Sequence, residues 1–341
     1  MKVLFIGGTG TISMAITRRL IDLNEEVYLL NRGNRSAELP EGVHVITADI
    51  NDEEDVKSKL SGMHFDSVCD FIGFVPESLE RDYRIFKGKT DQFMYISSAS
   101  AYHKPVQSYI INEGTSLANP YWEYSRNKIA CEELLMKYYR EDGFPVTIIR
   151  PSHTYDERSI PMGVHGNNGS WQVIKRMLEG KPVIIHGDGT SLWTMTHNSD
   201  FAKGFCGLIG NPHAIGEAFQ ITNDETLTWN QIYGCIAKAL GVELKPYYVS
   251  SEFLADVSDY DFTGSLLGDK ACSVVFDNSK LKKAVPEFRP TVHFEEGIRK
   301  TIANVLLKPE LQIEDPEFDK WCDNVIEALE NAKKAIRKNL L

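Results

Sequence analysis

Short apolar runs alternate with longer stretches of helical periodicity over the first 151 residues of the chain. The unbroken run Val3–Ile6 is typical of a strand buried on both faces, because a strand with one wet face would alternate polar and apolar residues. Helical stretches lie between such runs, the longest at 122–139. This alternation predicts an α/β fold with a doubly wound parallel sheet, whose ligands bind beyond the carboxyl ends of the strands. The predicted strands lie at 3–6, 26–30, 43–47, 67–72, 92–97 and 146–150.

The regular alternation ends at Pro151. We therefore expect a first domain at 1–151, rejoined by about 190–224, and a smaller C-terminal substrate-binding lobe at 152–189 and 225–310. Beyond Pro151 the pattern predicts a loop at 163–169, helices at 171–178, 229–240 and 294–306, and strands at 183–186, 218–222 and 247–250.

A docking helix at 315–341 is expected to end the chain. Its apolar side chains recur at helical spacing, which is typical of a stripe that packs against a neighbour. The members of this stripe are Phe318, Trp321, Val325, Leu329, Ala332 and Ile336.

The 341 residues include 37 Lys and Arg against 48 Asp and Glu, which leaves a net charge of −11. This balance repels phosphate polymers unless basic side chains gather in a patch. The densest basic stretch, 333–338, ends the last helix, whose first turn is acidic, and this polarity suits the helix dipole. Composition therefore predicts no nucleic-acid partner.

The six cysteines lie far apart and show no CxxC or Cys/His ligand spacing. This distribution predicts free thiols and no metal site, as in a reducing cytoplasm. A strand that begins at residue 2 does not fit a signal peptide, and no apolar run approaches the length of a membrane span. We expect a soluble cytoplasmic protein with no membrane partner.

A glycine-rich turn follows the first strand and precedes a stretch of helical spacing at 11–23. Gly7 and Gly10 lack the Cβ atoms that would keep the backbone away from a pyrophosphate, and the first free N–H groups of the helix point at that anion. The spacing is GxxGxxS rather than GxGxxG, with Ser13 at the third glycine position. The turn predicts a dinucleotide site, with an ordinary strand-to-helix turn as the alternative.

The end of the second predicted strand indicates which dinucleotide is bound. An acidic residue there would bind an unphosphorylated ribose, whereas this chain has Asn31, followed by Arg32 and Arg35. Guanidinium groups can hold a 2′-phosphate through paired charge-assisted bonds. NADP(H) is therefore favoured over NAD(H), with solvated loop arginines as the alternative. Asp49 and Ile50, after the third strand, are placed where an adenine edge would lie.

Hydroxyl side chains and a Tyr/Lys pair supply candidate chemistry. The segment 95–102 places serines at the carboxyl end of a buried strand, where they face the ligand side. Tyr124 and Lys128 are four residues apart on a predicted helix and therefore share a face. A phenol with a pKa near 10 is a poor base at neutral pH, but a nearby ammonium favours the phenolate. Proton exchange at pH 7 then becomes feasible.

With these motifs the chain resembles an extended, atypical member of the short-chain dehydrogenase/reductase superfamily, in its NAD-dependent epimerase/dehydratase family. The resemblance spans most of the chain and implies a Rossmann-type NAD(P)-binding domain and a homodimer. It implies that Tyr124 is the general acid/base, that Lys128 lowers its pKa and holds the nicotinamide ribose, and that Ser98 orients substrate. Ser98 stands four residues before Tyr102, as in the family, and Ser100 is the fallback. The matching segments are GGTGTIS, the serine segment, YSRNK, Ile149–Pro151, Gly187–Gly189 and Asp277–Lys280.

Departures from the family pattern narrow the implied function. The sugar 4,6-dehydratases of the family carry an Asp-Glu pair after the serine or threonine, where this chain has Ala99 and Ser100. Dehydration by that route is not expected. The segment Ser191–Met195 offers no arginine for a substrate diphosphate, so the substrate need not be nucleotide-linked. Relatives similar to isoflavone reductases or to chloroplast stem-loop-binding proteins share this segment, and many lack the catalytic tyrosine that this chain retains.

Further site residues are predicted from their places at strand ends and loops. For the aromatic ones, core packing is the alternative, and for His153 it is a satisfied structural role. The predicted nucleotide contacts also include Thr9, Thr11, Ile12, Phe71, Ile72, Gly73, Ser97, Pro151 and His153. The predicted substrate contacts are Phe74, Ser98, Ser100, Trp122, Asn168 and Trp193.

Two classes of function remain open from the sequence. The first is an NAD(P)-dependent oxidoreductase or epimerase that acts on a sugar or a related polyhydroxylated carbonyl compound by hydride transfer. The second is a non-catalytic dinucleotide-binding regulatory or RNA-binding relative. The negative charge and the Ser98, Tyr124, Lys128 set favour the enzyme.

Overall fold

The computed structural model describes residues 1–33 and 39–340 of the chain. By their internal contacts the residues form two compact units. Unit 1 comprises Met1–Thr154, Thr194–Thr226 and Val274–Val292, and unit 2 comprises Tyr155–Trp193, Leu227–Ser273 and His293–Leu341.

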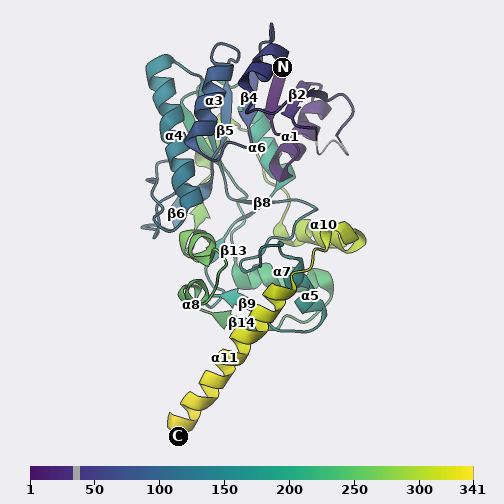
Figure 1. Ribbon diagram of the computed structural model, residues 1–341, viewed down its shortest axis with the longest axis vertical. Helices are drawn as coiled ribbons and strands as arrows, with labels where there is room; N and C mark the ends of the chain where they lie inside the picture. Colours follow the sequence, from purple (N-terminus) through teal and green to yellow (C-terminus); the bar gives the residue numbers. More distant parts are fainter. Residues whose placement is uncertain (34–38, 341) are drawn as a thin grey trace. The chain divides into compact units, whose positions relative to one another are not determined.

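Unit 1 is built on a parallel seven-stranded sheet, with strand order β12-β7-β5-β4-β1-β2-β3 (Figure 1). The predicted α/β fold is therefore confirmed, and each predicted strand up to residue 151 is present with ends within two residues of the prediction. The strands are β1 (Lys2–Ile6), β2 (Glu26–Asn31), β3 (His44–Thr47), β4 (Ser67–Asp70), β5 (Phe93–Ile96), β7 (Val146–Pro151) and β12 (Glu217–Ile221).

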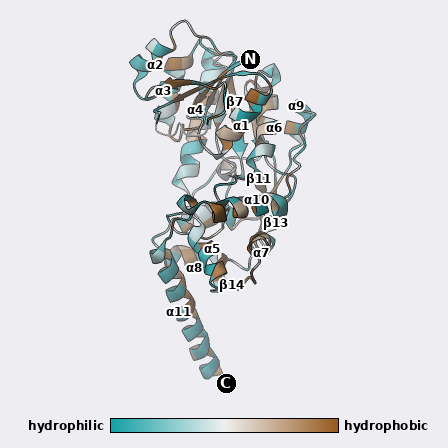
Figure 2. Ribbon diagram, turned by 90° about the vertical axis from the view of Figure 1, so that its right-hand side faces the viewer, coloured by the Kyte–Doolittle hydropathy of each residue, from teal (hydrophilic) through white to brown (hydrophobic). Residues whose placement is uncertain are grey.

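Helices cover both faces of this sheet, which explains why the run Val3–Ile6 of β1 is apolar without alternation. Val3 and Phe5 of β1 belong to one core, together with apolar residues of α1 and α6. Leu4 and Ile6 belong to a second core, with residues of α2, α3 and α4. Figure 2 shows the hydrophobic strands between more polar helices. The helices are α1 (Thr11–Asp22), α6 (Asn198–Leu208), α2 (Glu53–Lys59), α3 (Pro76–Phe86) and α4 (Glu123–Asp142).

Short elements complete unit 1. The segment 274–292 lies in this unit, whereas the sequence placed it in the lobe. Its strand β15 pairs with β6, and its helix α9 packs beside β12, which ties it to the sheet. The short elements are η1 (Ala99–Ala101), β6 (Ile110–Ile111), β8 (His153–Tyr155), β11 (Met195–His197), η2 (Pro212–Ala214), β15 (Val275–Phe276) and α9 (Ser279–Ala284).

Unit 2 has short strand pairs and helices around a buried aromatic centre. Trp229 and Tyr233 of α7 are fully buried there. β9 (Val183–His186) pairs with β14 (Pro246–Val249), and β10 (Leu192–Trp193) pairs with β13 (Leu227–Thr228). The helices are α5 (Trp171–Leu178), α7 (Trp229–Leu240), α8 (Ser251–Asp256), the π-helix η3 (Thr263–Lys270), α10 (Phe294–Leu307), η4 (Pro309–Leu311) and α11 (Pro316–Leu340).

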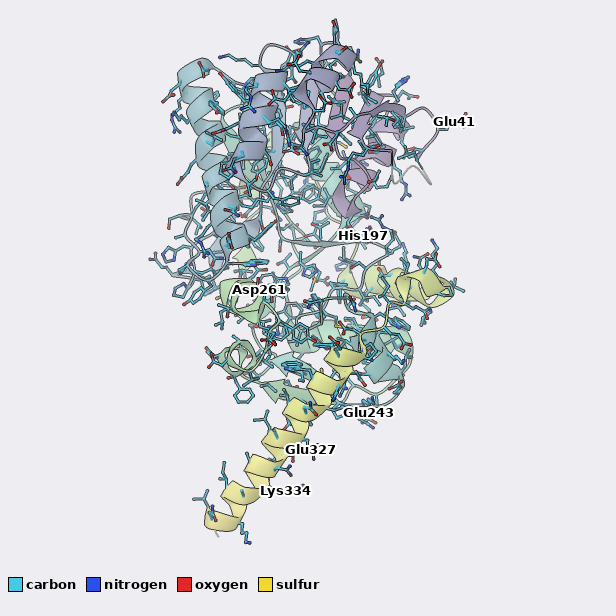
Figure 3. The ribbon with its side chains drawn as sticks, in the orientation of Figure 1. Glu41, His197, Glu243, Asp261, Glu327 and Lys334 are labelled. Carbon is cyan, nitrogen blue, oxygen red and sulfur yellow. The ribbon has the colours of Figure 1, made fainter. Side chains whose placement is uncertain are left out.

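The first half of α11 packs within unit 2. Phe318, Cys322 and Val325 are buried, and the buried Arg176 of α5 donates hydrogen bonds to side chains of α11. Residues 331–340 are exposed, and Figure 3 shows the labelled Glu327 and Lys334 on this helix. The apolar stripe is therefore covered at its start, while its last members lie in solvent. Within the described ranges, no helix is both long and apolar enough to cross a membrane.

Candidate active site

The turn after β1 requires glycine at two positions. Gly7 and Gly8 have φ angles of +98° and +97°, in the region that L side chains rarely adopt. A Cβ atom on Gly8 would also lie 2.6 Å from a methyl group of Leu29. The turn then leads through Gly10, whose backbone is extended, into the first residue of α1. The backbone N–H groups at this helix end can therefore approach an anion closely.

Ser13 has a structural role in this turn. Its Oγ accepts a hydrogen bond from the backbone N–H of Gly10 at 2.9 Å, and the side chain is 2% exposed. The third residue of α1 thus satisfies a donor at the helix start, as in a capping box. A serine at the family's third glycine position is accommodated in this way.

A cavity of about 420 Å³ lies beside the turn, between the ends of β1, β2, β3 and β4. On its wall Asn31 accepts the N–H of Gly33 at 2.8 Å through Oδ1, and Arg32 follows at the exposed edge. Arg35, which the sequence also placed here, lies outside the described residues. The lining residues are Gly7, Thr9, Leu30, Asn31, Arg32, Ala48, Asp49, Ile50, Asn51 and Ile72.

The cavity and the turn fit the adenosine and diphosphate parts of a dinucleotide. The positive end of the helix dipole at the start of α1 suits a diphosphate, and the apolar Ala48 and Ile50 suit the faces of a purine. Asp49 is engaged locally, since its Oδ1 accepts the backbone and side-chain N–H groups of Asn51 at 3.0 and 3.1 Å. Seven predicted nucleotide contacts line this cavity: Gly7, Thr9, Asn31, Arg32, Asp49, Ile50 and Ile72.

Lys128 is buried beneath the surface of unit 1, although lysine is ordinarily exposed. Its Nζ donates to the carbonyl oxygens of Gly73 at 2.8 Å and Ile96 at 2.7 Å. It lies 4.7 Å from the ring centre of Phe74 and 5.8 Å from that of Tyr124, one helical turn before it. Burial lowers the pKa of Lys128 to about 8, although the nearby carboxylate of Asp70 acts in the opposite direction.

A chain of hydroxyl groups approaches the same turn of α4. Ser98 and Ser100 are hydrogen-bonded through their Oγ atoms at 2.9 Å, and Ser125 Oγ donates to Ser100 Oγ at 2.7 Å. Ser125 directly follows Tyr124. The structure thus places both candidate serines, Ser98 and the fallback Ser100, in one hydrogen-bonded set with Ser125.

Ser97 differs from its neighbours because its hydroxyl group is turned into the core. It donates to Glu132, which also receives hydrogen bonds from Arg150 at 3.0 and 2.6 Å. Any contact between Ser97 and a nucleotide would therefore come from its backbone.

The remaining predicted residues of unit 1 lie around these groups. Trp122 and Phe74 flank Tyr124, with ring centres 4.9 and 6.4 Å away. Phe71 instead packs edge-on against Phe5 of the core, at 5.0 Å. The other members take positions at the ends of elements: Gly10, Thr11 and Ile12 at the start of α1, Gly73 after β4, Pro151 at the end of β7 and His153 at the start of β8.

Asn168 and Trp193 belong to unit 2. Trp193 is 3% exposed and stacks on Trp229 at 6.0 Å, which is a core position. Asn168 borders a separate cavity of about 510 Å³, and its backbone N–H donates to Asp315. Their role as substrate contacts stays a prediction.

Sequence reasoning did not single out Asp70, Asn51 and Ser125. Asp70 ends β4, and its Oδ1 accepts the backbone N–H groups of Ile72 and Gly73 at 2.8 and 3.0 Å. An acidic residue at the end of a buried strand was the available signal. In the described part of the chain, the His, Cys, Asp and Glu side chains form no group that could hold a metal ion.

Comparisons with known proteins identify the family of the chain. The model of the NAD dependent epimerase/dehydratase family matches residues 3–222. The chain is 24% identical over 290 residues to 2′-dehydrokanamycin reductase of Streptomyces kanamyceticus, with coverage of 85% of this chain and 80% of the reductase. It is 27% identical over 253 residues to the chloroplast stem-loop binding protein of 41 kDa b of Arabidopsis thaliana, with coverage of 70% and 63%.

Among solved structures, the chain is similar to UDP-glucuronic acid 4-epimerase from Bacillus cereus in complex with UDP-glucuronic acid and NAD. The TM-score is 0.71 at 22% identity, with coverage of 90% of this chain and 100% of the epimerase. This likeness concerns the fold, which is the one that the sequence predicted.

Proposed function

Because the chain belongs to the NAD dependent epimerase/dehydratase family, whose relatives include enzymes named as epimerases, dehydratases and reductases, we propose that it is a reductase or epimerase acting on a sugar or a related polyhydroxylated carbonyl compound. The observation that carries the proposal is the arrangement around the first turns of α4. There the buried ammonium of Lys128 lies one turn from Tyr124, and the linked hydroxyls of Ser98, Ser100 and Ser125 lead to the same turn.

Each site residue of unit 1 has its own role in the proposed reaction. Tyr124 exchanges a proton with the substrate oxygen, and Ser98 donates a hydrogen bond to that oxygen. Lys128 favours the phenolate of Tyr124 through its positive charge, because an ammonium nearby stabilises an anion. Gly7, Gly10 and the start of α1 hold the diphosphate of the dinucleotide, and the cavity of unit 1 holds its adenosine. The bound nicotinamide supplies or accepts hydride.

Dehydration is not part of the proposal. The positions that carry an Asp-Glu pair in the sugar dehydratases are Ala99 and Ser100 in this chain, and both are buried in η1. Ala99 has no group that can transfer a proton. Ser100 is held in the hydroxyl chain and has no carboxylate to remove a proton from carbon.

We propose NADP(H) as the preferred cofactor, with NAD(H) as the alternative. Arg32 and Asn31 border the cavity where an NAD-specific site would place a carboxylate. A guanidinium group at this edge suits a 2′-phosphate and leaves the adenine and diphosphate contacts unchanged.

A homodimer and a cytoplasmic location complete the proposal. The family resemblance suggests dimerisation through α4 and a neighbouring helix, and the molar mass measured by light scattering tests it. The six cysteines are free thiols, as is usual in a reducing compartment.

The test is substitution of Tyr124 by Phe, which keeps the ring and removes the exchangeable proton. Turnover of a responsive substrate from a panel of ketosugars and sugar alcohols should fall by about 10² to 10⁴-fold, the range for general acid/base groups. Tyr138→Phe, on the same helix, is the matched control. Unchanged turnover in Tyr124→Phe would remove the catalytic proposal. Net oxidation of NADPH during turnover identifies a reductase, whereas conversion without net oxidation identifies an epimerase.

A further inference from the structure

Two buried carboxyl groups lie in unit 1, one at the end of β4 and one in α3. Asp70 at the end of β4 and Asp82 in α3 are both completely inaccessible to solvent. Their carboxyl groups interact with each other, and each affects the pKa of the other. Ionised carboxylates only accept hydrogen bonds, so these two groups can bond to each other only through a proton.

The other contacts of the pair leave one oxygen on each side for this bond. Asp70 Oδ1 accepts the N–H groups of Ile72 and Gly73, and Asp82 Oδ1 accepts Arg81 Nε at 2.9 Å. The Oδ2 atoms of both residues are buried and have no donor among the described residues. A bare buried carboxylate oxygen is costly, whereas a proton between the two Oδ2 atoms satisfies both.

We propose that Asp70 and Asp82 share one proton, and that the resulting acid–carboxylate pair positions Lys128 for catalysis from behind the cofactor site. Asp70 acts through the loop that follows β4. Its Oδ1 fixes the backbone of Gly73, whose carbonyl oxygen accepts Lys128 Nζ at 2.8 Å and the hydroxyl of Tyr95 at 3.2 Å. The inference rests on the proposed function insofar as Lys128 is assigned to catalysis.

Gly73 allows this close approach of the loop to the pair. A Cβ atom on Gly73 would lie 2.2 Å from Asp70 Oδ2 and 2.8 Å from a methyl group of Leu79. Any larger residue would therefore displace either the loop or the carboxyl group. The contact between loop and pair thus depends on the absence of a side chain here.

The surrounding charges decide which oxygen holds the proton. Burial raises the pKa of both carboxyl groups, and that of Asp82 more strongly, because the charge on Asp70 adds to its burial. Arg81 lowers both pKa values, and Lys128 of α4 lowers that of Asp70. Two backbone N–H groups on Asp70 Oδ1 also favour the charged form of Asp70, so we assign the proton to Asp82 Oδ2, from which it is donated to Asp70 Oδ2. The negative charge remains on Asp70, next to Lys128.

The polar network also extends from the pair to the nucleotide cavity. Arg81 Nη1 donates to Asn51 Oδ1 at 2.7 Å, and Asn51 lines the cavity. Lys128 also lies near Cys131 and Glu132 of its own helix, α4. Both groups raise the pKa of Lys128. With the proposed proton between Asp82 and Asp70, hydrogen bonds would join Asn51 at the cavity wall to the Gly73 loop that holds Lys128.

Two isosteric variants separate this role from a structural one. In Asp82→Asn, the amide nitrogen replaces the proton donor and the charge stays on Asp70. In Asp70→Asn, the amide donates to Asp82, and the charge moves away from Lys128 toward Arg81. Loss of that charge should lower the pKa of Lys128, since an opposite charge nearby favours the ammonium.

The measurements are infrared spectroscopy with carboxyl-labelled aspartate and titration of NADPH affinity against pH. The wild type should show a protonated aspartate band at neutral pH, and each variant should lose it. The alkaline decline of NADPH affinity should shift to lower pH by about one unit or more in Asp70→Asn, and by much less in Asp82→Asn.

Absence of the band in the wild type overturns the shared proton, and this spectrum needs neither activity nor a variant that folds. Equal pH shifts in the two variants overturn the positioning role. Retained turnover in Tyr124→Phe, with the band and its losses as expected, would instead remove the proposed function and leave the pair in place.

Discussion

At the scale of single residues, Lys128 shows how burial changes what a side chain can do. The side chain of a surface lysine stays protonated well above neutral pH, because its pKa is about 10.4. Burial lowers the pKa of Lys128 to about 8. Two carbonyl oxygens accept its hydrogen bonds, so the charged form is retained at pH 7 although the side chain is 2% exposed. Its charge is therefore both close to Tyr124 and sensitive to mildly alkaline pH.

This sensitivity gives a pH prediction for cofactor binding. Because the ammonium is lost as pH rises through about 8, NADPH affinity of the wild type should fall above that pH. Lys128→Met should weaken binding by about 10 to 100-fold at neutral pH, the value of one hydrogen bond to a charged group, and abolish this decline. Lys137→Met, an exposed position on α4, is the control. If NADPH affinity still declines above about pH 8 in Lys128→Met, a group other than Lys128 causes the decline.

Arg32 carries the prediction on cofactor choice. Arg32→Ala should reduce affinity for NADPH by about 10 to 100-fold, because charge-assisted bonds to the 2′-phosphate are lost, and leave affinity for NADH nearly unchanged. Arg18→Ala, an exposed arginine of α1, should change neither. The measurement is fluorescence titration with both nucleotides. If the ratio of the NADPH and NADH affinities is unchanged in Arg32→Ala, Arg32 does not bind the 2′-phosphate.

At the scale of elements, the sequence predicted what hydrophobic burial determines locally. β1 could be placed from its own residues because both of its faces are covered, and α7 was predicted at its observed bounds, 229–240. The two-residue strands β6, β10, β13 and β15 and the π-helix η3 were not predicted. Such short segments have no periodicity of their own, and pairing with distant residues fixes them.

The candidate site was predictable to a similar degree. The glycine turn, the cavity wall and the Tyr124–Lys128 face followed from local spacing, and each of them lies in unit 1. The Asp70–Asp82 pair could not be found in this way, because only the packing of α3 on the sheet brings the two carboxyl groups together. The orientation of the Ser97 hydroxyl toward Glu132 could not be predicted for the same reason, since it also depends on packing between distant segments.

The start of α1 allows a prediction at this scale. Ser13→Ala removes the acceptor of the Gly10 N–H and should lower the free energy of unfolding by about 0.5 to 2 kcal/mol, as for other lost caps. Ser13→Gly, which restores the family's usual residue, should cost about 1 kcal/mol more through its poor helix propensity. Thermal unfolding compares both with Ser58→Ala, an exposed helical serine. A more stable Ser13→Gly protein would contradict this role of the hydroxyl.

At the scale of the whole molecule, charge separates the two classes of function. The net charge of −11 opposes contact with RNA phosphates, although one curated relative is named as a stem-loop binding protein. The basic stretch at 333–338 lies in the exposed part of α11, and within it Lys333 pairs with Glu330 at 3.1 Å. Any RNA affinity of this chain should therefore arise from that helix end.

The corresponding prediction concerns RNA binding and its dependence on salt. At about 0.15 M salt we expect no retardation of a structured RNA, because few phosphates can be neutralised. Binding seen at low salt should fall with a log–log slope no steeper than about 4, as four basic side chains on a duplex stem allow. Removal of residues 331–341 should abolish it without affecting NADPH affinity. Binding that resists salt or survives this truncation would favour the non-catalytic RNA-binding class, because it would require a basic surface that the net charge argues against.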